Sequence, residues 1–194
     1  MHPKDKEYYF SAGLLDRSNT VHVQMLDMWQ KVLTWSQIPE EYIYRYRILD
    51  FLPEESKICE ALRVYPVKKR EGRYGYVIDR PTDTLTNKIN FAIAGTFIRA
   101  GIDARVRTCR QALSEFADLG RFMGDVLILT DIEHYDEKML KYGAPRLWDL
   151  LNHLMLKGKF VIVITHDFAE SKGYFPDGVQ DFITAEYIFV RGSK

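Results

Sequence analysis

The sequence predicts an α/β protein: a five-stranded parallel sheet with helices on both faces. Three observations predict this fold. From Tyr74 onward, β-rich runs alternate with helical stretches, which is typical of βαβ units. The runs 126–129 and 161–164 are apolar at every position, as in strands buried on both faces. Gly101 and Gly158 mark turns that end two helical stretches just before strands.

These patterns place each element of the core. We expect strands at Tyr74–Asp79, Ala104–Thr108, Val126–Thr130, Phe160–Thr165 and Ala185–Arg191. We expect helices between them at Thr86–Ala100, Arg110–Phe122 and Ala144–Lys157.

The N-terminal third has a different, helical pattern. We predict that residues 1–66 form a helical docking segment and that residues 67–194 form the α/β core. Residues 1–19 are expected to be an extended arm, or one that orders on docking. A helix is expected from Val21 to Trp35 with Thr20 as its cap, and another is expected to open at 53–56 and run to about Val64. The apolar stripe of the first helix favours core packing, and a partner-binding face is the alternative.

Composition bounds the function classes. The chain has 194 residues, 46% of them hydrophobic, and 27 basic against 27 acidic residues, so bulk charge argues neither for nor against nucleic acid. Cys59 and Cys109 have no metal-site spacing and are expected to be buried or free thiols in a reducing cytoplasm. No apolar run is long enough to span a membrane, and the N-terminus lacks the pattern of a signal peptide.

Two basic stretches are candidate nucleic-acid contacts. Residues 40–51 interleave tyrosines with arginines, which can stack on bases and meet phosphates. Residues 68–73 form a basic turn before the first strand. For residues 40–51, the alternative is a helix that packs its tyrosines on the domain while its arginines face water. For residues 68–73, the alternative is a solvated loop. The candidate residues are Arg45, Arg47, Lys68, Lys69, Arg70 and Arg73.

The order of the motifs resembles a known family. The lead-in IPEEY (38–42), the stretch DVLILTDIE (125–133) and LWDLLNH (147–153), followed by KGKFVIVITHD (157–167), are similar to the AAA+ ATPase core of bacterial helicase loaders of the DnaC, DnaI and IstB type. The resemblance covers roughly residues 38 to 167. It implies the strand order 5-1-4-3-2 and a nucleotide site at the carboxyl ends of the strands.

The phosphate loop of that family has lost its chemistry here. The family loop reads Gly-Pro-Pro-Gly-Thr-Gly-Lys-Thr, and it falls on residues 80–87, RPTDTLTN. Pro81 and Thr84 match, whereas the glycine positions hold Arg80, Asp83 and Leu85, whose side chains obstruct a phosphate cradle. The lysine and magnesium-binding positions hold Thr86 and Asn87. Lys88 lies one position away, where a helix points the side chain elsewhere.

The acidic motif is reduced in the same way. Its first carboxylate position is Thr130 and its second is Asp131, and a shift by one residue makes Asp131 the metal-site acid. The fourth strand ends in Thr165-His166-Asp167, which is acidic where a phosphate belongs. The degenerate nucleotide site therefore comprises Thr84, Thr86, Asn87, Lys88, Asp131 and Asp167. Asp131 is the residual catalytic candidate, and the alternative is polar residues left at strand ends. A metal site that uses His134 has no diagnostic spacing.

A kept scaffold with a lost site indicates a non-catalytic role. We expect a helicase-loader-like subunit in DNA replication or transposition that docks on a replicative helicase or on an active AAA+ ATPase relative. We expect no cofactor, with ATP and magnesium bound only if the degenerate site still binds them, and no full lid domain. The alternatives are an NTPase with a rearranged site that uses Lys88 with Asp131 or Glu133, and a DNA-binding accessory module.

Overall fold

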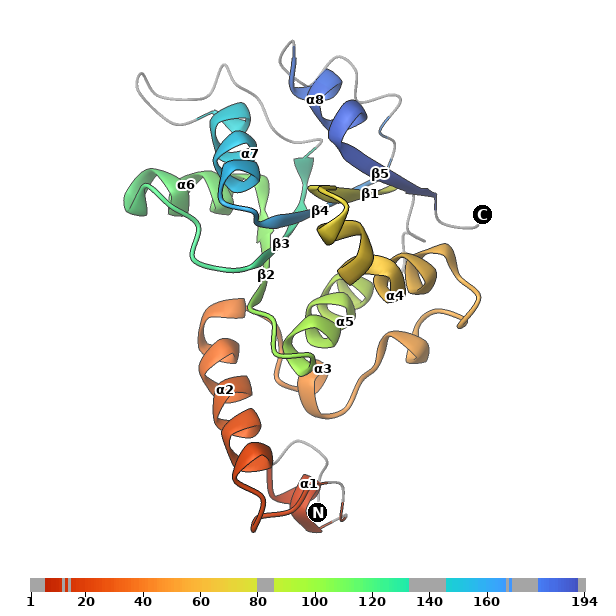
Figure 1. The fold of residues 1–194 in the computed structure, drawn as a ribbon, viewed down its shortest axis with the longest axis vertical. Helices are drawn as coiled ribbons and strands as arrows, with labels where there is room; N and C mark the ends of the chain where they lie inside the picture. The colour runs from red at the N-terminus through yellow and green to blue at the C-terminus, as the bar shows by residue number, and fades with distance from the viewer. Residues whose placement is uncertain are drawn as a thin grey trace.

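The computed structural model describes residues 6–11, 13, 15–79, 86–132, 146–166, 168 and 178–191. It confirms the predicted fold class and strand order. The five strands are all parallel and lie in the order β2-β3-β4-β1-β5 (Figure 1). The first and third strands are thus separated by the fourth. Their bounds are β1 Gly75–Asp79, β2 Ala104–Thr108, β3 Val126–Thr130, β4 Phe160–Thr165 and β5 Tyr187–Arg191.

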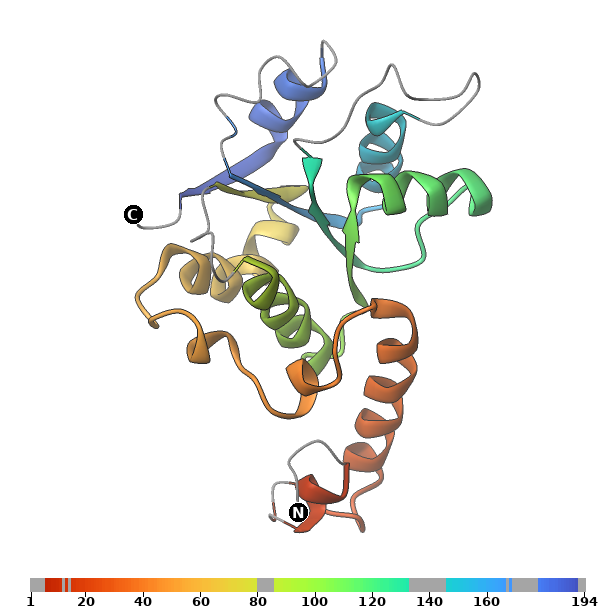
Figure 2. The same ribbon diagram turned by 180° about the vertical axis from the view of Figure 1, so that it is seen from behind.

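Helices cover both faces of the sheet, as predicted. Helices α4 (Lys57–Arg70) and α5 (Thr86–Arg99) lie on one face, and α6 (Cys109–Leu119), α7 (Leu147–Leu156) and α8 (Val179–Glu186) lie on the other (Figures 1 and 2). Alternate residues of each central strand feed the two cores. On β3, Ile128 packs with the α4–α5 side and Leu129 with the α6–α8 side, and both are fully buried.

Helix α8 is missing from the sequence-based prediction, which has a strand from Ala185. Gly178 precedes α8 with a positive φ of 92°, and Val179 and Ile183, one helical turn apart, are fully buried. The helix ends at Glu186, so β5 begins only at Tyr187. The pattern is short, and the β-branched residues that suggest a strand begin inside it.

Within the predicted N-terminal arm, residues 6–11 form a helix and not an extended segment. Helix α1 (Lys6–Ser11) buries Tyr9, whose ring meets the Trp29 ring edge-on at 5.8 Å between centroids. Helix α2 (Thr20–Ser36) is capped by Asn19 and not by Thr20, because Asn19 Oδ1 accepts a hydrogen bond of 3.0 Å from the Val21 amide.

Residues 40–51 form two short pieces instead of one helix. These are α3 (Glu41–Tyr44) and the 3-10 helix η1 (Ile48–Asp50). Helix α4 is longer than predicted and continues past Pro66 to Arg70. The last turn of this helix therefore contains Lys68, Lys69 and Arg70, which were predicted to lie in a loop before the first strand. The predicted boundary between residues 66 and 67 lies inside this helix.

Helices α3 and α5 approach each other closely. A Cβ at Gly95 would overlap the carbonyl oxygen of Tyr42, so only glycine fits at this crossing. Four residues along α5, the Arg99 guanidinium donates to the same carbonyl at 2.6 Å. Burial lowers the pKa of Arg99 to about 10, and the positive charge of Arg47 acts in the same direction. These contacts fix the N-terminal elements against the core.

Candidate functional site

The carboxyl ends of β1 and β4 lie side by side, where the sequence places the candidate site. Asp79 and Thr165 are register partners on the two strands. Asp79 is buried and its carboxylate accepts a hydrogen bond of 3.1 Å from the Phe168 amide. This carboxylate therefore holds the chain that leaves β4, and it is engaged inside the protein.

The end of β3 carries no carboxylate within the strand itself. Thr130 is its last residue, half-buried, and its hydroxyl donates to the Arg107 carbonyl on β2 at 3.5 Å. Asp131 follows, exposed, with a left-handed φ of 56°. Ile132, fully buried, anchors the chain immediately afterwards. The exposed Asp131 is thus held between a strand end and a buried side chain, in a backbone conformation that aspartate tolerates.

The third part of the candidate site is the start of α5. The helix begins at Thr86, and Asn87 and Lys88 are exposed. Thr84, the rest of the loop 80–85 and Asp167 lie outside the described residues, as do Glu133 and His134. Within the described ranges, no hydrogen bond or ion pair joins Lys88 to Asp131. Nor do three or more metal-binding side chains come together in that part of the chain.

In the part of the chain that the structure describes, two buried polar atoms near these strand and helix ends have no hydrogen-bond partner. Thr165 Oγ1, at the end of β4, and Asn90 Oδ1, in the second turn of α5, make no hydrogen bond, and their residues are 0% and 1% exposed. Such groups destabilise a fold unless something satisfies them. The sequence-based reading missed Asn90, although an asparagine between Ile89 and Phe91 in an apolar helix is a usable signal.

The basic candidates of residues 40–51 separate into one exposed and one engaged arginine. Arg45 is exposed, with its guanidinium 5.1 Å from the centre of the Tyr46 ring. Arg47 is half-buried, and it donates to the Ile43 carbonyl at 3.0 Å and to the Tyr9 hydroxyl at 3.1 Å. Arg47 therefore links α1 to α3.

The basic candidates at the end of α4 lie together but differ in their partners. Lys68 forms an ion pair of 2.8 Å with Glu71. Lys69 lies 5.9 Å from the Tyr65 ring centre, and Arg70 and Arg73 donate to backbone carbonyls. Within the described ranges, Lys69, Arg70 and Arg73 have no carboxylate partner, and all three are exposed.

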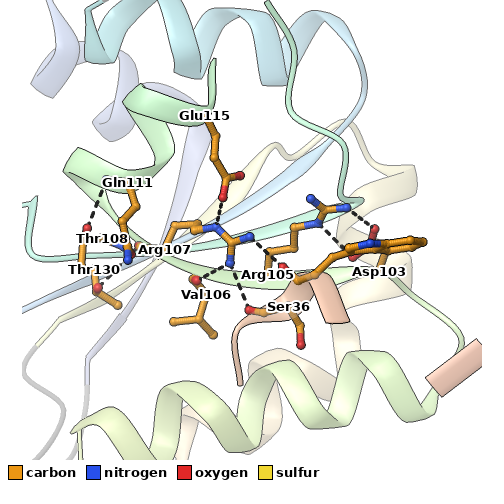
Figure 3. A network of polar contacts seen from close by, with 10 residues as sticks. Ser36, Asp103, Arg105, Val106, Arg107, Thr108, Gln111, Glu115 and Thr130 are labelled. Carbon is orange, nitrogen blue, oxygen red and sulfur yellow. Dashed lines mark hydrogen bonds and ion pairs between the residues drawn. The ribbon is translucent and has the colours of Figure 1, made fainter. Parts of the chain in front are cut away.

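Sequence reasoning also missed the buried arginine that attaches α2 to the sheet. Arg107 on β2 is 3% exposed and forms an ion pair with Glu115 of α6 (Figure 3). Its guanidinium donates to the carbonyls of Trp35 at 2.7 Å and Ser36 at 3.1 Å, at the carboxyl end of α2. A cation there satisfies the last helical carbonyls and complements the helix dipole. The N-terminal helix is thereby tied to the edge strand.

The two cysteines lie inside the protein. Cys59 and Cys109 are buried and unpaired with each other, which confirms the prediction of free or buried thiols. Burial raises the pKa of the Cys109 thiol to about 12, so the nucleophilic thiolate is disfavoured. None of the described helices is long and apolar enough to cross a membrane.

Comparison with known proteins gives the fold a context. No family model and no curated protein sequence matches the chain. Solved structures do match. The DnaI structure superposes with a TM-score of 0.56 at 12% identity, and the alignment covers 81% of this chain and 93% of that chain. DnaA from Aquifex aeolicus bound to AMPPCP gives a TM-score of 0.58 at 15% identity, over 77% of this chain.

The likeness to the DnaA structures is partial in length. One of them is the replication initiator DnaA bound to AMPPCP and single-stranded DNA, with a TM-score of 0.57 at 15% identity. The matched region spans half of the DnaA chains. At these identities the comparison concerns the fold, and the shared feature is the five-stranded parallel sheet with the order 2-3-4-1-5. The chain therefore has an AAA+-like α/β fold, the fold of DnaA and DnaI.

Proposed function

We propose that the chain is a non-catalytic, helicase-loader-like adaptor in DNA replication or transposition. In this proposal it docks on a replicative helicase or on an active AAA+ ATPase relative, and residues 1–66 make the contact. The observation that carries the proposal is an AAA+-like fold in which residues 80–87, which follow β1, contain no glycine and no lysine.

The fold supports the replication context. The matched DnaI structure is covered over 93% of its length, so the likeness spans that chain and not one βαβ unit. One fold serves many functions, so direct binding to a helicase is the measurement that tests this context.

The residues of the site support the loss of catalysis. Phosphoryl transfer depends on positioning and on charge neutralisation by a backbone cradle, a lysine and a metal-binding carboxylate. In this chain the loop positions 80–87 read RPTDTLTN, β3 ends in Thr130, and the buried carboxylate at the end of β1 already binds the Phe168 amide. Of the described residues at these strand and helix ends, Asp131, His166, Asn87 and Lys88 are exposed.

The N-terminal elements support a docking role. Arg107 and Arg99 connect α2 and α3 to the core through their hydrogen bonds to backbone carbonyls. Helix α2 buries Leu26, Trp29 and Val32, while Val21 is 65% exposed. A helix fixed at its carboxyl end, with apolar residues exposed near its start, has the features of a partner-binding helix.

The test is direct binding to the replicative helicase of the same host. We expect the full chain to bind either the helicase or the active ATPase relative in biolayer interferometry without nucleotide. Val21→Glu is expected to weaken binding about tenfold or more. Leu156→Glu is the matched control, because Leu156 is 73% exposed at the end of α7. Binding to neither partner, or equal binding by the two variants, contradicts the proposal.

A second candidate function has a specific observation in its favour. Lys69, Arg70 and Arg73 are exposed and have no carboxylate partner among the described residues, which suits contacts to a DNA backbone. If DNA binding is the function, affinity falls steeply with salt and the slope decreases when these three residues are replaced by glutamine. No binding at low salt dismisses this candidate.

A further inference from the structure

The two edges of the sheet are treated differently. The outer strand β2 carries the buried Arg105 and Arg107, and the last residues of α2 cover it through the Arg107 contacts to Trp35 and Ser36 (Figure 3). Charged residues and a covering helix are the usual protection of a sheet edge against further strand pairing. At the other edge lies β5, at the opposite side of the sheet from α2 (Figure 1).

Among the described residues, the β5 edge is less protected, since its one charged residue is Arg191 at the end of the strand. The strand begins Tyr187-Ile188-Phe189-Val190, without lysine or proline, and Phe189 is 40% exposed. Beside it runs a groove of about 680 Å³ between β5 and α4. One face of α4 lines this groove with residues three or four positions apart, among them Ala61 and Val64 between Lys57 and Lys68. An open strand edge beside an apolar groove is a template for one more strand.

We propose that β5 pairs with β5 of a second copy of this chain, in antiparallel register about a twofold axis, to form a continuous ten-stranded sheet. The strand is self-complementary about Phe189, since Ile188 then lies opposite Val190 of the second copy. Pairs of this kind, apolar or aromatic, are the ones that stabilise antiparallel strands. Apolar side chains of the added strand fill the groove over Ala61 and Val64.

The charges along α4 favour a second copy over another occupant. A twofold axis perpendicular to the sheet places both α4 helices on the same face, running in opposite directions. Residues 54–60 contain three glutamates and one lysine, whereas residues 68–73 contain four cations and one glutamate. The acidic segment that leads into α4 of one copy therefore faces the basic end of α4 of the other, so the same stretch of chain supplies both sides of the complementarity.

The remaining quantities are consistent with a dimer of modest affinity. The chain has 27 basic and 27 acidic residues, so two copies have no net repulsion. Five paired residues alone bury too little surface, because a specific interface needs about 1,000 Å² or more. The groove and the facing α4 flanks supply the rest, and we expect dissociation in the micromolar range, about 1–50 µM.

Sedimentation velocity on the full chain, from about 1 µM to about 200 µM, measures this equilibrium. We expect the mass to rise with concentration from the 22.7 kDa of one chain to twice that value. Phe189→Lys is expected to weaken the dimer at least about tenfold, because a lysine blocks an edge strand. The matched control is Leu119→Lys, at an exposed apolar residue at the end of α6, which should leave the dimer unchanged.

A charge swap tests the geometry. Glu60→Lys and Lys68→Glu, both at the groove, should each weaken the dimer about tenfold, since a twofold repeats every unfavourable contact. In an equimolar mixture the heterodimer has opposite charges at both contacts, so the mixture should regain the wild-type affinity. Thermal unfolding of each variant checks that the loss of the Lys57–Glu60 or Lys68–Glu71 pair has not unfolded the chain.

Three results overturn the proposal. The first is a wild-type chain that sediments as one copy at every concentration. The second is Phe189→Lys dimerising as the wild type does, which removes β5 from the interface. The third is a mixture of the two charge variants that stays as weak as either alone, which removes the antiparallel α4 arrangement.

Discussion

Replacing Arg107 by methionine tests how the N-terminal helix is held to the core. The substitution keeps an unbranched side chain and removes the guanidinium. It deletes the ion pair with Glu115 and the hydrogen bonds to the Trp35, Ser36 and Val106 carbonyls. The Trp35 and Ser36 carbonyls at the end of α2 then lack a hydrogen-bond donor, and the nearby Glu115 carboxylate lacks its cation.

The cost follows from burial. Removing one member of a buried ion pair costs about 3–5 kcal/mol because the other charge remains uncompensated. The Glu115 side chain is 28% exposed and regains part of its hydration, which places the value near the lower limit. We therefore expect a loss of about 3 kcal/mol in the free energy of unfolding. With a urea slope of about 2–3 kcal/mol per molar for a chain of this size, the midpoint falls by about 1–1.5 M.

Urea unfolding followed by circular dichroism measures the midpoint, and hydrogen exchange measures the α2 amides. The α2 amides should exchange faster in Arg107→Met, while those of β3 and β4 keep their order of protection. Arg63→Met is the control, since Arg63 forms an exposed pair with Glu54 and exposed pairs contribute little. An Arg107→Met protein within about 0.5 kcal/mol of wild type, with α2 equally protected, refutes this reasoning.

Three further predictions concern stability: one substitution should lower it, one should raise it, and one should change its dependence on pH. Gly95→Ala, which in an exposed helix stabilises by about 1 kcal/mol, should instead destabilise by roughly 2 kcal/mol because its Cβ overlaps the Tyr42 carbonyl; a raised melting temperature would contradict the close approach. Thr165→Val should stabilise by about 1 kcal/mol, since it removes a buried hydroxyl without a partner, and a destabilised variant in urea unfolding would mean that the hydroxyl is bonded in solution. Burial raises the pKa of Tyr76 to about 12 from its ordinary value of 10.0, so the folded state keeps a proton that the unfolded state releases. The contribution of Tyr76 to the free energy of unfolding is therefore complete below about pH 10 and is lost as the pH rises toward 12. Tyr76→Phe should reduce the fall in the free energy of unfolding over this range, and an unchanged fall would assign it to other groups.

The sequence allowed the sheet to be predicted because its signal is local and redundant. The runs at 126–129 and 161–164 are apolar at both odd and even positions, as expected for strands buried on both faces. Strands β2, β3 and β4 begin and end at the predicted residues. The strand order came from the resemblance and not from periodicity, and the structure confirms it.

The errors lie where tertiary contacts decide local structure. Helix α1 is too short to form by itself, and it is held by the Tyr9 contacts to residues 34 and 35 positions away in the sequence. Helix α4 continues past Pro66, although a proline usually ends a helix. Arg107 looked like an ordinary strand residue, because nothing local shows that α2 ends beside it.

The candidate site was predictable only in part. The ends of β1, β3 and β4 and the start of α5 are where the strand pattern places them, because parallel strands bring their carboxyl ends to one edge. The use of Asp79 to bind the Phe168 amide was not predictable, since it depends on the path of the chain after β4. The roles proposed for the site residues all stay predictions, and two of these residues, Thr84 and Asp167, lie outside the described residues.

Titration of magnesium-ATP into the full chain, with phosphate release followed in parallel, tests the central claim most directly. The account predicts no saturable heat below about 1 mM nucleotide and no turnover above the blank, because positions 80–87 offer no glycine cradle and no lysine. Micromolar binding, together with hydrolysis that Asp131→Ala abolishes, would contradict it and assign the chain to the active ATPases.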